Sequence, residues 1–288
     1  MSLLDRIRIC HRRDMAKYRP FLVDGAAIGW INRDLVARLR GFPRIFHVAE
    51  NGVALIPAGY EARTAAMADV VATLRDEGLV TGWRDEEFPV ASTFYAPPLF
   101  AIERAAVKAF GIRYYCVQLN GLVGDGEHQR MWIGCRAMSK PIGPGKLDQI
   151  VGGGVPLGYS LTEALVKECA EEAGMAAGLA GRAHPVGAIT ILAEEDGGLW
   201  HETLFNYDLT LPDDFVPKNV DGEVESFELL SVAEVRRRLE SSDDFLFDVV
   251  PLLADCLMRH GHLSADDPDY VALAELLAAE PNLTGHGL

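Results

Sequence analysis

The stretch GGGVPLGYSLTEALVKECAEEAGM, residues 152–175, decides the fold of this chain. Its Ser160 and Glu163 fit a capping box, in which each side chain bonds the backbone amide at the other position and so opens a helix. Gly174 stands where a glycine commonly ends a helix. Between these two signals lie about 13 residues of good helix propensity. The sequence therefore predicts an amphipathic helix that directly follows a glycine-rich turn.

Glutamates cluster along one side of this predicted helix. At about 100° per residue, Glu168 and Glu172 fall within about 40° of each other at the edge of the apolar stripe, and Glu171 stands on its outer flank. Carboxylates at these spacings repel one another, by a few tenths of a kcal/mol per exposed pair and more when partly buried. Hard carboxylate oxygens beside a flexible turn are suitable ligands for a Mg²⁺ ion that binds a phosphate chain. A solvated acidic face is the alternative interpretation.

The same stretch closely resembles the Nudix box, whose general form is G-x5-E-x7-R-E-U-x-E-E-x-G-U with U aliphatic. Gly153 matches the first glycine, Glu168 the first metal glutamate, Glu171 and Glu172 the glutamate pair, and Gly174 the final glycine. The resemblance implies a hydrolase that uses Mg²⁺, or Mn²⁺ in its place. It also implies that the ion is held by these three glutamates next to Gly153.

Two positions depart from the box. Lys167 stands where an arginine is usual, and Tyr159 where the early glutamate is usual. A lysine can still pair with a neighbouring carboxylate, although as a point charge and not as a planar fork. The missing glutamate removes part of the usual outer shell around the metal, whereas the expected metal ligands are intact.

Further segments resemble a subgroup of Nudix proteins that is often labelled thiamin-pyrophosphokinase-related and carries an extra N-terminal domain. These segments are WRDEEFPV (83–90), IERAAVKAFGI (102–112), NGLV (120–123), KPIGPGKLDQIVGGG (140–154) and DGEVESFEL (221–229). The resemblance implies hydrolysis of oxidised or damaged thiamin diphosphate to the monophosphate and phosphate. A glutamine, Gln118, stands where this subgroup usually has a histidine.

The expected fold is α/β (α+β): a Nudix α/β/α sandwich with a mixed sheet, preceded by a small α/β domain. We predict an N-terminal domain at 1–111 and a Nudix domain with C-terminal helices at 112–288. Within the first domain, apolar residues at helical spacing predict a helix over 63–78. The pair Pro97-Pro98 is expected to open a second helix that runs to Gly111.

Residues outside the box complete the predicted site. Glu223 and Glu225 alternate on one predicted strand and so share a face. We take Glu223 as an extra ligand or general base, and a pair of surface charges is the alternative. Because the fold is acidic, basic side chains must hold the phosphates. Arg136, Lys140 and Lys146 are the candidates, against the alternative of ordinary solvated side chains.

Polar and aromatic residues on predicted strands are the candidates for contact with the organic part of a substrate. Gln118 comes before the pair Asn120-Gly121, and Asn120 is itself a candidate, although an Asn-Gly pair is more often simply a turn. Trp132, like Tyr114 and Trp200, offers a ring on which a heteroaromatic group could stack. Aromatic residues on strands are more often part of the core.

Composition narrows the class of protein. The 288 residues carry a formal net charge of −15, which argues against nucleic-acid or anionic-membrane binding because both need a basic surface. The five cysteines are an odd number without a C-x-x-C pair, as expected in a reducing compartment. We expect a cytoplasmic protein without a signal peptide or membrane span, a monomer or homodimer that binds a small-molecule diphosphate.

Other functions remain open at this stage. A nucleoside diphosphate or nucleotide sugar would be a substrate of the same chemical class. A Nudix-fold isopentenyl diphosphate isomerase would need a catalytic cysteine in a polar setting, and the sequence shows none. A non-catalytic binding module would have little reason to keep mutually repelling carboxylates.

Overall fold

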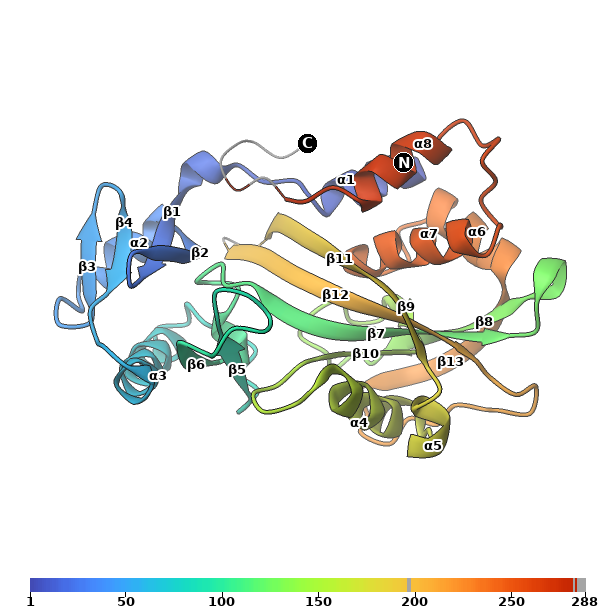
Figure 1. The fold of residues 1–288 in the computed structure, drawn as a ribbon, viewed down its shortest axis with the longest axis horizontal. Coiled ribbons are helices and arrows are strands. Elements are labelled where there is room, and N and C mark those ends of the chain that lie inside the picture. The colour runs from blue at the N-terminus through green and yellow to red at the C-terminus, as the bar shows by residue number, and fades with distance from the viewer. Residues whose placement is uncertain (196–197, 282, 284–288) are drawn as a thin grey trace.

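A four-stranded sheet forms the base of the N-terminal unit, drawn in blue in Figure 1. The computed structural model describes residues 1–195, 198–281 and 283. The strands follow the order β2-β1-β4-β3, with β1 and β4 parallel and the other pairs antiparallel. The elements of this unit are β1 Tyr18–Val23, β2 Ala26–Asn32, α2 Arg33–Leu39, β3 Phe46–Ala49, β4 Gly52–Leu55, α3 Tyr60–Asp76, β5 Glu87–Val90 and β6 Phe100–Glu103.

Helix α3 confirms the helix that the spacing of apolar residues predicts over 63–78. Met67, Val70, Val71 and Leu74 are each at most 1% exposed and join one core with residues of the sheet and of β5 and β6. The helical repeat places all four side chains on one face, and the burial of that face holds α3 against the unit.

The second helix predicted for this unit is wrong. After Pro97-Pro98 the chain forms strand β6, which pairs antiparallel with β5. Phe100 and Ile102 alternate into the core at 0% and 2% exposure. Only a short 3₁₀ turn, Arg104–Ala106, follows the strand. Strand pairing and the burial of alternate residues outweigh the good helix propensity of this segment, which is a tertiary effect.

The C-terminal unit is built on a seven-stranded mixed sheet. Its main path is β11-β12-β7-β8-β13, with β10 paired to β7 and β9 paired to β8. Strands β12 and β7 are parallel, and the other pairs are antiparallel. The strands are β7 Tyr114–Val123, β8 Arg130–Arg136, β9 Leu147–Gln149, β10 Val151–Gly154, β11 His184–Glu195, β12 Gly198–Thr210 and β13 Val224–Ser231.

Helices cover both faces of this sheet (Figure 1). Those of the C-terminal unit are α4 Leu161–Ala173, α5 Ala177–Ala180, α6 Val232–Ser241, α7 Val250–Arg259 and α8 Tyr270–Leu277. Val117 and Leu119 of β7 pack in the cluster formed with α4 and α5. Leu122 of β7 packs in the opposite cluster, with α6 and α7. The arrangement confirms an α/β/α sandwich with a mixed sheet.

The first helix of the chain packs with the last ones. In α1, Leu3–Ile9, the side chains of Leu3, Leu4 and Ile7 join the cluster formed by α6, α7 and α8. Beyond α1, the carbonyls of Cys10 and Arg12 accept hydrogen bonds from β11 amides. We keep the division of the chain at residue 111 as a proposal, with α1 as a part of the N-terminal segment that packs on the Nudix unit.

No helix among the described residues combines the length and the apolar character that crossing a membrane requires.

Three successive glycines let β10 lie against three different side chains. A Cβ atom on Gly152 would lie 2.3 Å from Gln118 Oε1. One on Gly153 would lie 2.2 Å from Glu168 Cδ, and one on Gly154 2.3 Å from Phe88 Cζ. Any other residue here would displace a neighbour from β7, α4 or β5. The glycine turn of the sequence is thus a strand at which both units and α4 meet.

Replacement of Gly154 tests the contact between the two units. Gly154→Ala places a methyl group into the ring of Phe88, which is 1% exposed, and should lower the free energy of unfolding by about 1–3 kcal/mol. Urea-induced unfolding measures the change. Gly178→Ala is the control, because nothing lies within 4 Å of a Cβ at that helical position. Equal stability of both variants would contradict the contact.

Candidate active site

A cavity of about 890 Å³ is lined by residues of both units. The C-terminal unit contributes the glycines of β10, the exposed edge of α4 and the start of β7. The N-terminal unit contributes residues around β5 and β6, among them Arg84, Glu86 and Arg104. The sandwich thus provides one wall of the cavity, and the N-terminal unit provides another.

Helix α4 is capped at both ends, which fixes the direction of its glutamates. Ser160 and Glu163 form the reciprocal capping box, and Gly174 ends the helix in the left-handed conformation at φ 61°. Glu168 and Glu172 are buried, at 8% and 5% exposure. The helix therefore directs two carboxylates into the protein, toward β10, and not into solvent.

Glu172 lies deeper than the other two glutamates of the box. Its Oε2 atom accepts a hydrogen bond of 2.8 Å from the amide of Gly152, a residue that lines the cavity. Burial raises the pKa of Glu172, and the nearby carboxylates of Asp148 and Glu168 raise it further. Burial also raises the pKa of Glu168. A positive charge placed between the two carboxylates would stabilise their ionised forms.

Lys167 partly supplies such a charge. Its Nζ atom lies 2.6 Å from Glu171 Oε2 and 3.1 Å from Glu168 Oε1. The lysine at the arginine position of the box therefore bridges two of the glutamates as a point charge. An ammonium group held by two carboxylates also shows that this place accepts a cation, and hard oxygen ligands suit a divalent metal ion.

Basic side chains gather on the cavity as well. Arg136 and Lys140, two of the predicted phosphate-binding residues, line it. Arg136 is held by Asp148 at 2.6 Å, and Lys140 contacts Glu223. Burial, together with the charge of Arg136, lowers the pKa of Lys140. Cations this close together repel one another, so an anionic ligand would stabilise them.

Two cavity arginines come from the N-terminal unit, and sequence reasoning missed them. Arg84 lies 3.7 Å from Glu223, and Arg104 lies 2.8 Å from Glu86. Arg84 lies in segment 83–90 and Arg104 in segment 102–112. Both segments resemble the thiamin-related subgroup, and this resemblance was the sequence signal that could have identified the two arginines. Glu223 itself precedes β13, lines the cavity and lies between the cations of the two units.

The structure separates three predicted substrate-binding residues from the cavity. Lys146 points to the loop before the short helix Phe247–Val249, where its ammonium group bonds the carbonyl of Asp243. Trp132 packs at the edge of the cluster under α4. Its place on β8 puts the ring on the face opposite the buried Ile133.

Asn120 is the third of these residues. It lies on the same face of β7 as Gln118, which does line the cavity. Asn120 is fully buried, and its amide group bonds Asn206, Asp208 and Gln149. Since these three partners occupy its polar atoms, Asn120 has a structural role.

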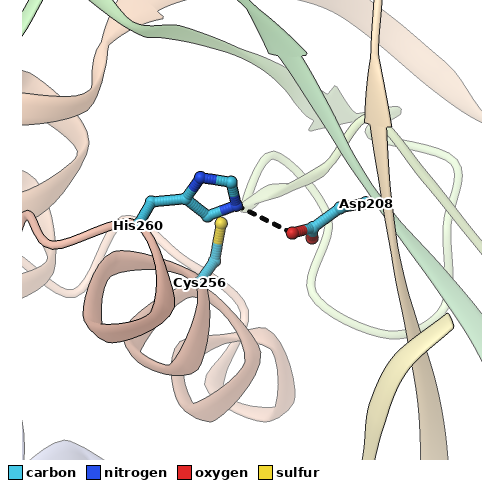
Figure 2. A group of neighbouring side chains, drawn as sticks. All are labelled: Asp208, Cys256 and His260. Carbon is cyan, nitrogen blue, oxygen red and sulfur yellow. Dashed lines mark hydrogen bonds and ion pairs between the residues drawn. The ribbon is translucent and has the colours of Figure 1, made fainter. Parts of the chain in front are cut away.

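Figure 2 shows a second group of polar side chains, Asp208, Cys256 and His260. Their donor atoms lie within 4.8 Å of one another. His260 Nε2 lies 2.8 Å from Asp208 Oδ2, and both terminal nitrogens of Arg259 also contact this carboxylate. The guanidinium group already supplies the countercharge, so we interpret the group as an ion-pair network that fastens α7 to β12.

Gly153→Ala tests whether the approach of β10 to α4 shapes a metal site. The new methyl group meets only the end of a flexible side chain, so the melting temperature should change little. It should nevertheless displace the Glu168 carboxylate and weaken the binding of Mn²⁺ by about 10- to 100-fold in calorimetry. Gly178→Ala should bind as the unchanged protein does. Equal affinity in all three proteins would exclude this role of Gly153.

Two family models match successive parts of the chain. Residues 2–114 match a family described as a domain of unknown function, DUF4743, and residues 120–252 match the NUDIX domain. The crystal structure of DR0079 from Deinococcus radiodurans superposes with a TM-score of 0.40 at 21% identity, over 50% of this chain and 82% of that one.

Two plant proteins are similar along nearly the whole chain. Nudix hydrolase 24, chloroplastic, of Arabidopsis thaliana is 38% identical, over 94% of this chain and 76% of that protein. Nudix hydrolase 20, chloroplastic, of the same plant is 39% identical, over 96% of this chain and 77% of that protein. With this identity over both the N-terminal unit and the box, the chain belongs to the Nudix hydrolase family.

Proposed function

We propose that this Nudix hydrolase cleaves the diphosphate linkage of oxidised or damaged thiamin diphosphate, which yields the monophosphate and phosphate. One observation carries the proposal. In a chain with a net charge of −15, Arg84, Arg104, Arg136 and Lys140 line one cavity beside the glutamates of α4. That cavity has the charges needed to hold a diphosphate in place. The specific ring follows from the resemblance of segments 83–90 and 102–112 to the thiamin-related subgroup.

Nudix hydrolases generally use a divalent metal ion, and we propose Mg²⁺, or Mn²⁺ in its place, for this one. Glu168 and Glu172 would hold the ion beside Gly153, with Glu171 as a further ligand once Lys167 releases it. A bound divalent ion screens the phosphate charge and lowers the pKa of water near the attacked phosphorus.

The side chains of the cavity have separate roles in this proposal. Arg136 and Lys140 bind phosphate oxygens from the Nudix unit, and Arg84 and Arg104 bind them from the N-terminal unit. Glu223 accepts a proton from the attacking water, because its carboxylate is kept at the cavity wall by Lys140 and Arg84. Water is thereby activated next to a substrate that both units hold.

The cellular location and the oligomeric state of the protein stay predictions. We propose a cytoplasmic location, in keeping with the free cysteines, and a monomer or homodimer. The Arabidopsis relatives carry the word chloroplastic in their names, which describes those proteins.

A panel of diphosphates tests the substrate. Thiamin diphosphate, oxidised thiamin diphosphate, ADP-ribose and a nucleotide sugar are incubated with the protein and Mg²⁺, and products are separated by chromatography. We expect the oxidised thiamin compound to have the highest kcat/KM. Preference for a nucleotide would keep the hydrolase chemistry and refute the thiamin assignment. Absence of products with every compound would refute the proposed reaction class.

Substitution of the carboxylates tests their roles. Glu172→Gln should lower kcat by about 100-fold or more while the fold is kept, because the helix loses a repulsion and retains its packing. Glu223→Gln should also lower kcat. Glu225→Gln is the matched control, since Glu225 lies two residues farther along and is exposed. Full activity of Glu172→Gln would contradict its assignment as a ligand.

A further inference from the structure

Two buried carboxylates line the cavity away from the Nudix box. Glu202 lies on β12 and Asp248 on the short helix Phe247–Val249, and they are 3% and 5% exposed. In the parallel register, Glu202 is opposite Tyr114, at the start of β7, whereas Gly152 is opposite Gln118. The step of four residues from Tyr114 to Gln118 corresponds to about 13 Å along a strand. This second pair is therefore separated from the metal-binding glutamates.

The hydrogen bonds of this pair are incomplete. Trp200 Nε1 donates to Glu202 at 2.5 Å, which fixes the orientation of that carboxylate. Asp248 Oδ1 is a buried acceptor for which the described residues supply no hydrogen-bond partner. Glu202 and Asp248 both line the cavity and are more than nine-tenths buried. An acceptor left unpaired in the interior costs about 1–3 kcal/mol, and more when it is charged.

The charges of Arg136 and Arg104 lower the pKa of Asp248 and of Glu202 respectively, but the hydrogen bonds of both arginines go to other groups. Arg136 is directed to Asp148 and to the carbonyl of Ile142, and Arg104 to Glu86. Burial raises the pKa of Asp248, and the charge of Glu202 raises it further. The side chains of Trp200, Tyr114 and Cys116 already bond Glu202, so the unpaired acceptor of the two carboxylates is Asp248 Oδ1. The complement of two buried carboxylates with one unpaired oxygen is a ligand that brings an N–H group or a positive charge.

The walls around these acceptors are apolar and partly aromatic. Tyr114 lies on the cavity with its ring centroid 6.5 Å from that of Trp200, and Cys116 and Leu246 line the same space. A flat ring can pack against such walls and direct its edge to the carboxylates. A flexible aliphatic amine would leave this surface unused.

We propose that this end of the cavity binds a planar nitrogen heterocycle that carries an amino group or a positive charge, with Glu202 and Asp248 as the acceptors that select it. The inference rests on the proposed function in one respect. It takes the diphosphate of the same substrate to lie at the end of the cavity that α4 forms. It assigns specificity to residues outside the box. Glu202 and Asp248 distinguish among rings and take no part in the cleavage of the diphosphate.

Ring compounds without phosphate test the inference on the full chain. Thiamin, adenosine and uridine are titrated in EDTA by calorimetry, so that neither metal nor hydrolysis contributes. We expect thiamin, with its positive charge and amino group, to bind more tightly than uridine, which has no amino group. Glu202→Gln and Asp248→Asn should each weaken thiamin binding at least tenfold. Both variants should bind inorganic pyrophosphate with Mg²⁺ within about twofold of the unchanged protein.

Steady-state kinetics adds a readout that loss of structure would not give. With the best diphosphate of the panel, each variant should raise KM about tenfold and change kcat little. Glu225→Gln is the control. Melting temperatures identify a variant that does not fold. Because Glu202→Gln removes a buried charge and keeps the shape, it serves as the deciding variant if Asp248→Asn is unfolded.

The outcomes separate this inference from the proposed function. Tight binding of adenosine, lost in both variants, would support the inference and refute the thiamin assignment. If no amino-bearing or cationic ring binds, or if the folded variants bind thiamin as the unchanged protein does, the inference is wrong. Hydrolysis of oxidised thiamin diphosphate with unaltered KM in Glu202→Gln would overturn it while leaving the proposed function in place.

Discussion

The close approach of strand β10 to its neighbours is the constraint on which the rest of the structure depends. Three glycines bring the backbone within reach of Gln118, Glu168 and Phe88, which belong to the sheet, to α4 and to the N-terminal unit. The amide of Gly152 in the same strand donates a hydrogen bond to Glu172. Because these three side chains occupy the space beside the glycines, the relative positions of the parts depend on the close approach of the β10 backbone. The glutamates of α4 and the arginines of the other unit are thereby placed around one cavity.

The cavity also resolves an electrostatic problem of this acidic chain. Anionic ligands are repelled by a net charge of −15 unless positive side chains are gathered locally. Here the two units share that task, and carboxylates such as Glu86 and Asp148 keep the arginines in place. Charges of both signs are thus arranged in advance, so that a ligand replaces existing partners and does not have to order free side chains.

Sequence patterns predicted those elements that depend on interactions between residues close together in the chain. Capping residues and helical spacing were enough to place α4 and its glutamates, since both act within a few residues. The segment after Pro97-Pro98 was misassigned because its strand depends on β5. Strand position alone could not distinguish Gln118 from Asn120, because the side chains that occupy Asn120 come from β9 and β12, 29 to 88 residues farther along the chain. Arg104 and Glu202 line the cavity because of tertiary packing, which cannot be predicted from the pattern of a single sequence.

The path of the chain before β1 has a mechanical consequence. The N-terminal unit is joined to the sandwich by the segment that leads into β7 and also by residues 10–12, whose carbonyls bond the edge of β11. With α1 anchored on α7 and α8 beyond that edge, the unit has two covalent tethers. A body held at two points is restricted to rotation about the line that joins them. Entry and exit of ligands therefore depend on this one rotation and on movements of loops and side chains at the cavity mouth.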